Sequence, residues 1–166
     1  LGGGYVNNWD TVSFAQYVKS RDKKKNIILA RDHGGPWQHP IEVEKYKDIE
    51  DAMESSKLSY LRDIEAGFQI LHIDPVISNS KEEPTAEWIL DKIFRLYEFC
   101  ENKARELGRE VYFEIGTEEQ KQNPLKDIRQ LEYVIQSIRK FCDERSFRYP
   151  TFLVVQTGTK VMETRN

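Results

Sequence analysis

Acidic and histidine side chains end three short apolar runs of this 166-residue chain. Asp32 and His33 follow the first run. His72 and Asp74 end the second run, and Glu114 lies in the third. Carboxylates and imidazoles bind divalent metals and move protons near neutral pH. Because the carboxyl ends of parallel strands converge on one face, this recurrence predicts a shared site there.

Each of these groups also has a structural explanation. An Asp-His pair can cap a sheet without binding anything, and a histidine in an apolar run, such as His72, is more often a hydrogen-bonded core residue than a ligand. A carboxylate inside a strand, such as Glu114, is costly unless a metal or a cation satisfies it, and Arg31 is one candidate cation. The prediction of a site therefore rests on the recurrence at three strand ends and not on one residue.

Helices and strands that would position these groups alternate along the chain. Apolar residues at helical spacing predict helices over about Asp10–Val18, Ile49–Ala66, Thr85–Leu107 and Pro124–Cys142. Continuously apolar runs between and after them predict strands at a spacing of about 42 residues. The last run begins at Phe152. This alternation is typical of βαβ units in a parallel sheet whose strands are covered on both faces.

Two α/β architectures satisfy this pattern, an open doubly wound sheet and a part of a TIM (β/α)8 barrel. A complete barrel typically needs about 250 residues, which is more than this chain provides. No Gly-x-Gly-x-x-Gly turn follows any predicted strand, so a dinucleotide-binding sheet has weak support. The sequence therefore favours a single domain over residues 1–166 that forms a partial barrel.

Composition narrows the classes of partner. The net charge of −3 gives no electrostatic reason to expect a nucleic-acid ligand. No apolar run approaches the roughly 20 residues of a membrane helix. Cys100 and Cys142 lie among apolar neighbours in predicted helices, which indicates buried thiols and not a disulfide framework or a zinc cluster. We therefore predict a cytoplasmic protein that binds neither nucleic acid nor a membrane.

Four blocks of the sequence resemble one protein family. The blocks are Gly3-Gly4-Tyr5, Asp32-His33-Gly34-Gly35-Pro36-Trp37-Gln38, Ala66-Gly67-Phe68 with Leu71-His72-Ile73-Asp74, and Glu114-Ile115-Gly116-Thr117-Glu118. In order and approximate spacing they are similar to the accessory, non-catalytic subunits of class II tagatose-bisphosphate aldolase. That family is related to the metal-dependent class II sugar-bisphosphate aldolases, which are (β/α)8 barrels. The resemblance implies that this chain holds about strands two to five of such a barrel.

The resemblance also implies roles for individual residues. Asp32 matches the aspartate that moves a proton at the aldol hydroxyl, and His33 matches a zinc-binding histidine. Glu114 resembles a glutamate near that metal. Glu118 or Glu119 would act as the base on the enolate side of the substrate. The further polar residues that we predict as substrate contacts are Arg31, His72, Asp74 and Gln156.

Two departures from the catalytic aldolases keep the function open. Residues 119–124 replace their glycine-rich loop, and the sequence offers only two zinc ligands, His33 and Glu114, where catalytic zinc usually has three. Three hypotheses for the function follow. In the first, the chain is an aldolase-type subunit that acts on a sugar phosphate, either as the catalytic subunit or in support of one. In the second it is a metal-dependent sugar epimerase or isomerase, and in the third it is a non-enzymatic assembly protein. The open strand edges of a partial barrel also predict an oligomer or a partner chain.

Overall fold

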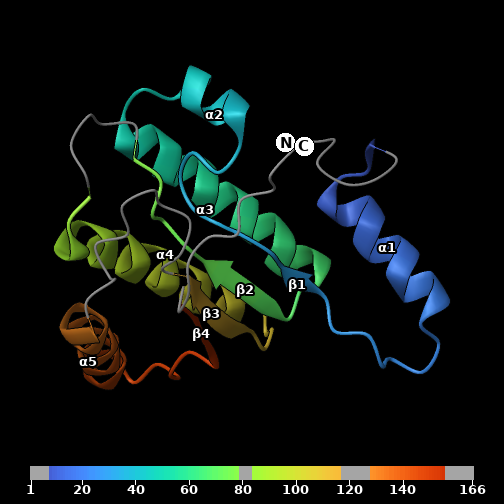
Figure 1. Cartoon of the computed structure of the whole chain (residues 1–166). Coiled ribbons are helices and arrows are strands. Elements are labelled where there is room, and N and C mark those ends of the chain that lie inside the picture. Colours follow the sequence, from blue (N-terminus) through green and yellow to red (C-terminus); the bar gives the residue numbers. More distant parts are fainter. Residues whose placement is uncertain (1–7, 79–83, 117–127, 156–166) are drawn as a thin grey trace, which may run out of the picture.

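The computed structural model describes residues 8–78, 84–116 and 128–155 of the chain. Helices and strands alternate along it (Figure 1). In chain order they are α1 (Thr11–Arg21), β1 (Ala30–Arg31), α2 (Pro40–Lys45), α3 (Ile49–Ala66), β2 (Ile70–Ile73), α4 (Ala86–Glu106), β3 (Tyr112–Gly116), α5 (Ile128–Arg145) and β4 (Phe152–Val154). The predicted α/β class is confirmed.

The four strands form one parallel sheet in the order β1-β2-β3-β4. Each strand pairs with the next strand in the sequence, and at least one helix lies between them, as parallel pairing requires. In this register Ala30 lies opposite Ile70, and His72 lies opposite Glu114. Polar residues from neighbouring strands are therefore placed side by side near the carboxyl end of the sheet.

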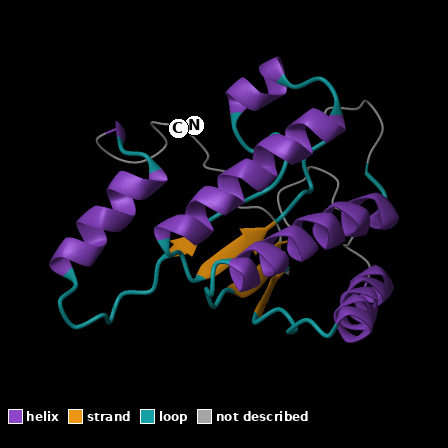
Figure 2. Ribbon diagram, turned by 180° about the vertical axis from the view of Figure 1, so that it is seen from behind, coloured by secondary structure: helices purple, strands orange, loops and turns teal. Residues whose placement is uncertain are grey.

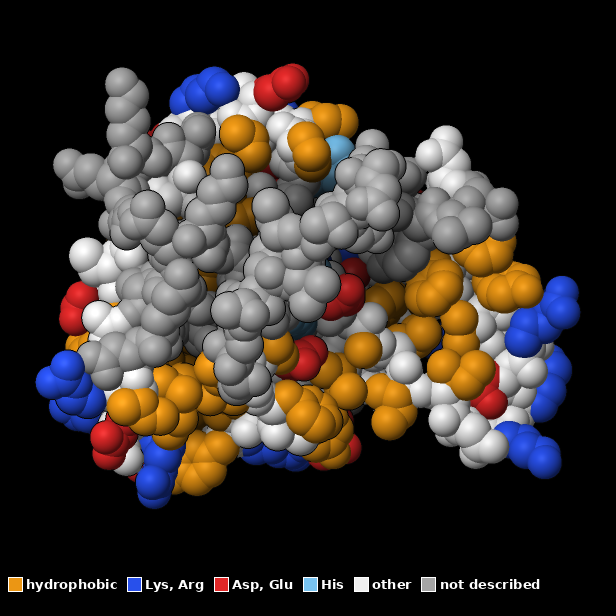
Figure 3. Space-filling model, viewed as in Figure 1, with side chains coloured by type: hydrophobic (Ala, Val, Ile, Leu, Met, Phe, Trp, Pro, Cys, Tyr) orange, Lys and Arg blue, Asp and Glu red, His pale blue; other side chains and the backbone are white. Residues whose placement is uncertain are grey.

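The helices cover one face of the sheet. Figure 2 shows α3 and α4 in front of the strands, and side chains on that face, such as Leu71 and Ile115, are completely buried. On the opposite face Tyr112 is 38% exposed and Phe152 is 48% exposed. Hydrophobic side chains are also visible there around the residues drawn in grey (Figure 3). His72 on this same face is only 2% exposed, so the face is partly covered, and the prediction that both faces are covered stays a prediction.

Capping residues explain where the helices begin and end. Asp10 accepts a hydrogen bond from Ser13 N–H at 2.7 Å at the start of α1. Asp48 accepts one from Glu50 N–H at 2.8 Å at the start of α3. Gly67 ends α3 with a φ of 88°, a left-handed conformation that glycine adopts without strain. The predicted boundaries of this helix, residues 49–66, are confirmed.

One short helix, α2, was not predicted from the sequence. It has six residues and begins at Pro40, and the His39 side chain caps it by accepting a hydrogen bond from Ile41 N–H at 3.2 Å. Six residues complete fewer than two turns, so no apolar periodicity can mark such a helix.

Both cysteines are buried and unpaired, as predicted. Burial raises the pKa of the Cys142 thiol to about 11, and it raises the pKa of Cys100 far above the usual value. Because the thiolate is the reactive form, we expect both thiols to react with a disulfide reagent at pH 8 at least about 100-fold more slowly than free cysteine. Unfolding in guanidinium chloride should expose two reactive thiols per chain. A thiol that reacts at the full rate in the native protein would contradict this burial.

Candidate metal centre

A tight turn follows β1 and carries the first part of the candidate site. His33 has a left-handed backbone with a φ of 50°, and its carbonyl accepts a hydrogen bond from Arg31 Nε at 2.9 Å. Gly34 is packed so closely that a Cβ atom there would lie 2.1 Å from Tyr60 Oη and 2.5 Å from the His72 carbonyl oxygen. The turn therefore requires glycine at position 34 and holds His33 in a fixed place.

Asp74, which directly follows β2, contacts the His33 side chain. Its Oδ2 lies 2.6 Å from His33 Nδ1. Its Oδ1 accepts hydrogen bonds from Gly34 N–H at 2.7 Å and from Gln38 Nε2 at 3.0 Å. Asp74 is completely buried, and burial raises the pKa of its carboxyl group, although the hydrogen bonds with His33 and Gly34 oppose this effect. The carboxyl group is therefore surrounded by protein groups.

His72 lies on β2 beneath the turn. Its Nδ1 accepts a hydrogen bond from His33 N–H at 3.3 Å and lies 3.8 Å from Asp32 Oδ1. Glu114 Oε2 is also 3.8 Å from this nitrogen. His72 Nε2 is buried, and no group of the described residues forms a hydrogen bond with it. Gly116 leaves room for it, because a Cβ atom there would lie 2.3 Å from His72 Nε2.

Asp32, His33 and His72 form a cluster that could hold a metal ion. One possible ligand atom of each residue lies within 4.8 Å of the other two. Two ligands of a tetrahedral zinc ion are roughly 3.4 Å apart, given bond lengths of about 2.0–2.2 Å. The 3.8 Å between Asp32 Oδ1 and His72 Nδ1 is close to that separation. A donor set of one carboxylate and two imidazoles suits a divalent ion such as zinc. Binding through His72 Nδ1 would replace the hydrogen bond that this nitrogen accepts from His33 N–H.

Glu114, predicted as a metal ligand, lies beside this cluster. Its carboxylate approaches His72, but it does not belong to the group of mutually close ligand atoms. Glu118, Glu119 and Gln156 lie outside the described residues, and their predicted roles stay predictions. The structure thus brings polar groups from the ends of three neighbouring strands together, as their positions in the sequence suggested.

Arg31, predicted as a substrate contact, lies against α3. Its Nη1 donates to Asp63 Oδ2 at 2.6 Å and to Ser59 Oγ at 2.8 Å, and its guanidinium lies over the Tyr60 ring. Thr11 Oγ1 also donates to Asp63, at 3.1 Å. Burial raises the pKa of the Asp63 carboxyl group, although Arg31 and Thr11 oppose this effect. Arg31 and Asp63 therefore tie β1 to α1 and α3.

A cavity of about 750 Å³ adjoins the cluster. Asp32 and His33 line it together with Gln38, with Trp9 before α1 and with Tyr46 after α2. The Asp32 side chain is 92% exposed, so its carboxylate can contact a bound molecule. Cavities of this volume with aromatic walls and a few polar groups are typical of small-molecule sites. The candidate metal centre therefore has space beside it for a substrate.

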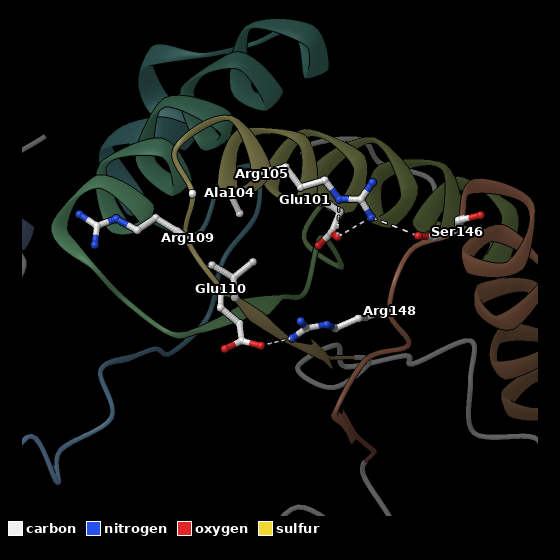
Figure 4. Close-up of a pocket in the computed structure, with 9 residues that line it drawn as sticks. Glu101, Ala104, Arg105, Arg109, Glu110, Ser146 and Arg148 are labelled. Carbon is white, nitrogen blue, oxygen red and sulfur yellow. Dashed lines mark hydrogen bonds and ion pairs between the residues drawn. The ribbon is translucent and has the colours of Figure 1, made fainter.

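A second cavity, of about 500 Å³, lies at the opposite end of the sheet, where β3 begins (Figure 4). Two ion pairs lie in it: Arg105 with Glu101 at 2.9 Å, and Arg148 with Glu110 at 2.8 Å. Arg105 also donates to the carbonyl of Ser146 at 3.1 Å. These contacts connect α4 with the segment that follows α5. They give Arg105 and Arg148 a structural role, and we place the candidate site at the first cavity.

Two residues of the site, Gln38 and Gly116, were not predicted to belong to it. Gln38 contacts Asp74, and Gly116 makes room for His72. A signal for Gly116 exists in the sequence, because it lies two positions after Glu114 and so on the same face of the strand. No comparable pattern marks Gln38, whose contact depends on the path of the turn.

In the described part of the chain, no helix combines the length and the apolar character that a membrane span requires.

Comparison with known proteins shows the fold of the chain. No protein-family model and no curated protein matches the sequence. The chain is similar to the crystal structure of a probable tagatose 6 phosphate kinase from Sinorhizobium meliloti 1021, with a TM-score of 0.66 and 20% identity over 95% of its length. This chain spans 40% of the length of that protein, and at this identity the likeness establishes a shared fold.

Proposed function

We propose that this chain is a subunit of a metal-dependent, class II ketose-bisphosphate aldolase, similar to tagatose-1,6-bisphosphate aldolase, and acts in carbohydrate metabolism. The observation that carries the proposal is the cluster of Asp32, His33 and His72 at the ends of two neighbouring parallel strands. The name of the structural neighbour, a probable tagatose 6 phosphate kinase, supports a phosphorylated ketose as the ligand. The subunit either cleaves the sugar itself or supports a catalytic partner.

We further propose that the four strands belong to a (β/α)8 barrel. Strands of such a barrel are parallel and pair in sequence order, as β1 to β4 do. Side chains on the inner face of a barrel fill its interior, and Tyr112 and Phe152 lie on the face that the helices leave open. A doubly wound sheet would reverse its strand order at the point where the ligand binds, and the four described strands show no reversal.

The residues of the cluster suit chemistry at a sugar carbonyl. A divalent ion at this position would act as a Lewis acid that polarises the carbonyl of a ketose. His33 and His72 would hold the ion through ring nitrogens. The exposed carboxylate of Asp32 faces the cavity and can accept a proton from a hydroxyl of a bound sugar. Glu118 and Glu119 stay predictions for the base on the enolate side.

Zinc binding by three histidine variants tests the metal centre. We expect the wild-type chain to bind one zinc ion, and His33→Ala and His72→Ala to bind it at least about 100-fold more weakly, because each lacks one of the two imidazoles that would hold the ion. His39→Ala is the matched control, since His39 also lines the cavity but is not in the cluster. Isothermal titration calorimetry measures the affinities. Equal affinity in all three variants, or a wild type that binds no zinc, would contradict the proposal.

Activity assays separate the two forms of the proposal. The zinc-loaded chain is incubated with tagatose and fructose bisphosphates, with and without a catalytic aldolase subunit. Cleavage by the chain alone that is lost in Asp32→Asn and His33→Ala would establish a catalytic subunit. An inactive chain that raises the activity of the added subunit would establish a supporting one. Epimerisation without cleavage would favour a sugar epimerase instead.

A further inference from the structure

We propose that Asp74 is a positioning residue, which keeps the His33 imidazole in the tautomer with its proton on Nδ1, so that Nε2 is the nitrogen that binds the metal. This inference rests on the metal centre proposed above. Asp74 is completely buried and does not line the cavity, whereas His33 does. The proposal therefore assigns Asp74 to the orientation of a ligand in place of the substrate contact expected from the sequence.

Hydrogen bonds to Oδ1 determine which way the Asp74 carboxyl group faces. Gly34 N–H and Gln38 Nε2 donate to Oδ1 at 2.7 Å and 3.0 Å. Gln38 Nε2 also donates to the Asp74 backbone carbonyl at 2.9 Å. The other oxygen, Oδ2, meets His33 Nδ1 at 2.6 Å. An ionised carboxylate can only accept, so the proposal assigns the proton of this short hydrogen bond to Nδ1 and the lone pair of the neutral ring to Nε2.

The backbone of His33 is fixed independently of its ring. Its carbonyl accepts from Arg31 Nε at 2.9 Å, and its N–H donates to His72 Nδ1 at 3.3 Å. Asp74 N–H donates to the next carbonyl, that of Gly34, at 2.8 Å. Because the main chain is held, the imidazole ring of His33 can change its orientation only by rotation about its side-chain bonds. It can change its tautomer only by moving its proton between the two nitrogens. The hydrogen bond with the Asp74 carboxylate opposes both changes. Histidines that bind metals are commonly oriented through the nitrogen that does not bind the metal.

Asp74→Asn distinguishes positioning from structural support. Asparagine has the same shape, and its oxygen can still accept from Gly34 N–H and Gln38 Nε2, but its amide nitrogen donates where Oδ2 accepted. His33 Nδ1 must then accept, which moves the ring proton to Nε2. We expect zinc to bind about 10- to 100-fold more weakly. Nitrogen–proton correlation NMR spectra of the zinc-free chain should show His33 changing from the Nδ1–H to the Nε2–H tautomer.

Glu42→Gln is the matched control. Glu42 is another buried acid beside the same cavity, and its Oε1 accepts a hydrogen bond from Ser55 Oγ at 2.8 Å. Its substitution should change neither the zinc affinity nor the His33 tautomer. An equal loss of zinc affinity in Asp74→Asn and Glu42→Gln would indicate a general structural effect and would overturn the positioning role.

The outcomes for Asp74 and for the metal centre are distinguishable. If the wild type binds zinc and Asp74→Asn binds it equally well, the positioning role is refuted and the metal centre stands. If the wild type binds no zinc, the proposed function fails, and the His33 tautomer still reports whether Asp74 controls the ring. The spectrum of the wild-type chain needs no variant. An Nε2–H ring in it would refute the role of Asp74 even if Asp74→Asn did not fold.

Discussion

Replacing Arg31 with methionine is expected to lower the free energy of unfolding by about 3–5 kcal/mol, because Asp63 then keeps a buried charge without its partner. The Arg31 and Asp63 side chains are only 16% and 4% exposed, and 2.6 Å separates Nη1 from Oδ2. Burial raises the pKa of Asp63 even in the presence of Arg31, so the guanidinium only partly offsets the desolvation of the carboxylate. Loss of the hydrogen bonds to Ser59 and to the His33 carbonyl adds to the effect.

Urea unfolding followed by circular dichroism measures this loss. The double variant Arg31→Met/Asp63→Leu should recover part of it, because an apolar pair of similar volume can replace a buried ion pair. Arg62→Met is the control, since Arg62 pairs with Glu65 at the surface over 3.4 Å and such pairs contribute little. Equal effects of Arg31→Met and Arg62→Met would show that the buried pair does not stabilise the junction of β1 and α3.

Gly34→Ala should lower the free energy of unfolding by about 3 kcal/mol or more, because the turn has no space for a methyl group. The added Cβ atom would lie 2.1 Å from Tyr60 Oη, 2.5 Å from the His72 carbonyl oxygen and 2.6 Å from Arg31 Nε. Tyr60 Oη donates to that same carbonyl at 2.7 Å, so neither group can move away without losing this hydrogen bond. Relief of the clash would therefore displace the turn that carries His33.

Gly108→Ala provides the comparison for this substitution. Gly108 has a φ of 60°, but no atom lies within 4 Å of the position that its Cβ would take. Its substitution should cost only the backbone strain of about 1–2 kcal/mol. Urea unfolding of both variants compares the steric cost at Gly34 with the backbone strain at Gly108. If Gly34→Ala is no less stable than Gly108→Ala, the close packing of the turn is wrong.

The central strands follow the sequence more closely than the first edge strand does. The apolar runs that end near Asp74 and Gly116 become β2 and β3, as predicted. The run that begins at Ile27 yields a strand of only two residues. Ile27 N–H donates to the Asp22 side chain at 2.8 Å, and Ile28 is 60% exposed. Strand propensity depends on neighbours on both sides and on burial, and an edge position lacks part of both.

Residue types at strand ends are visible in a sequence, and this made most of the candidate site predictable. Asp32, His33 and His72 all lie at the ends of apolar runs in the sequence, which predicts each of them as a site residue. Which of the neighbouring carboxylates joins the cluster was not predictable, because it depends on distances across the sheet of a few ångströms. The burial of Asp74 was not predictable either, since a carboxylate that orients a histidine and one that meets a ligand can occupy the same sequence position.

Within the described residues, each strand of the sheet pairs with the strands that directly precede and follow it in the chain. Contacts between sequence neighbours close short loops, which lowers the entropy lost before pairing begins. A ribosome releases about 5–20 residues per second, and chains can fold from the N-terminal end as they emerge. β2 can therefore pair with β1 while the later segments are still being translated. β4 then emerges to find the edge of β3 already formed, so the sheet can grow vectorially, one strand at a time, during synthesis.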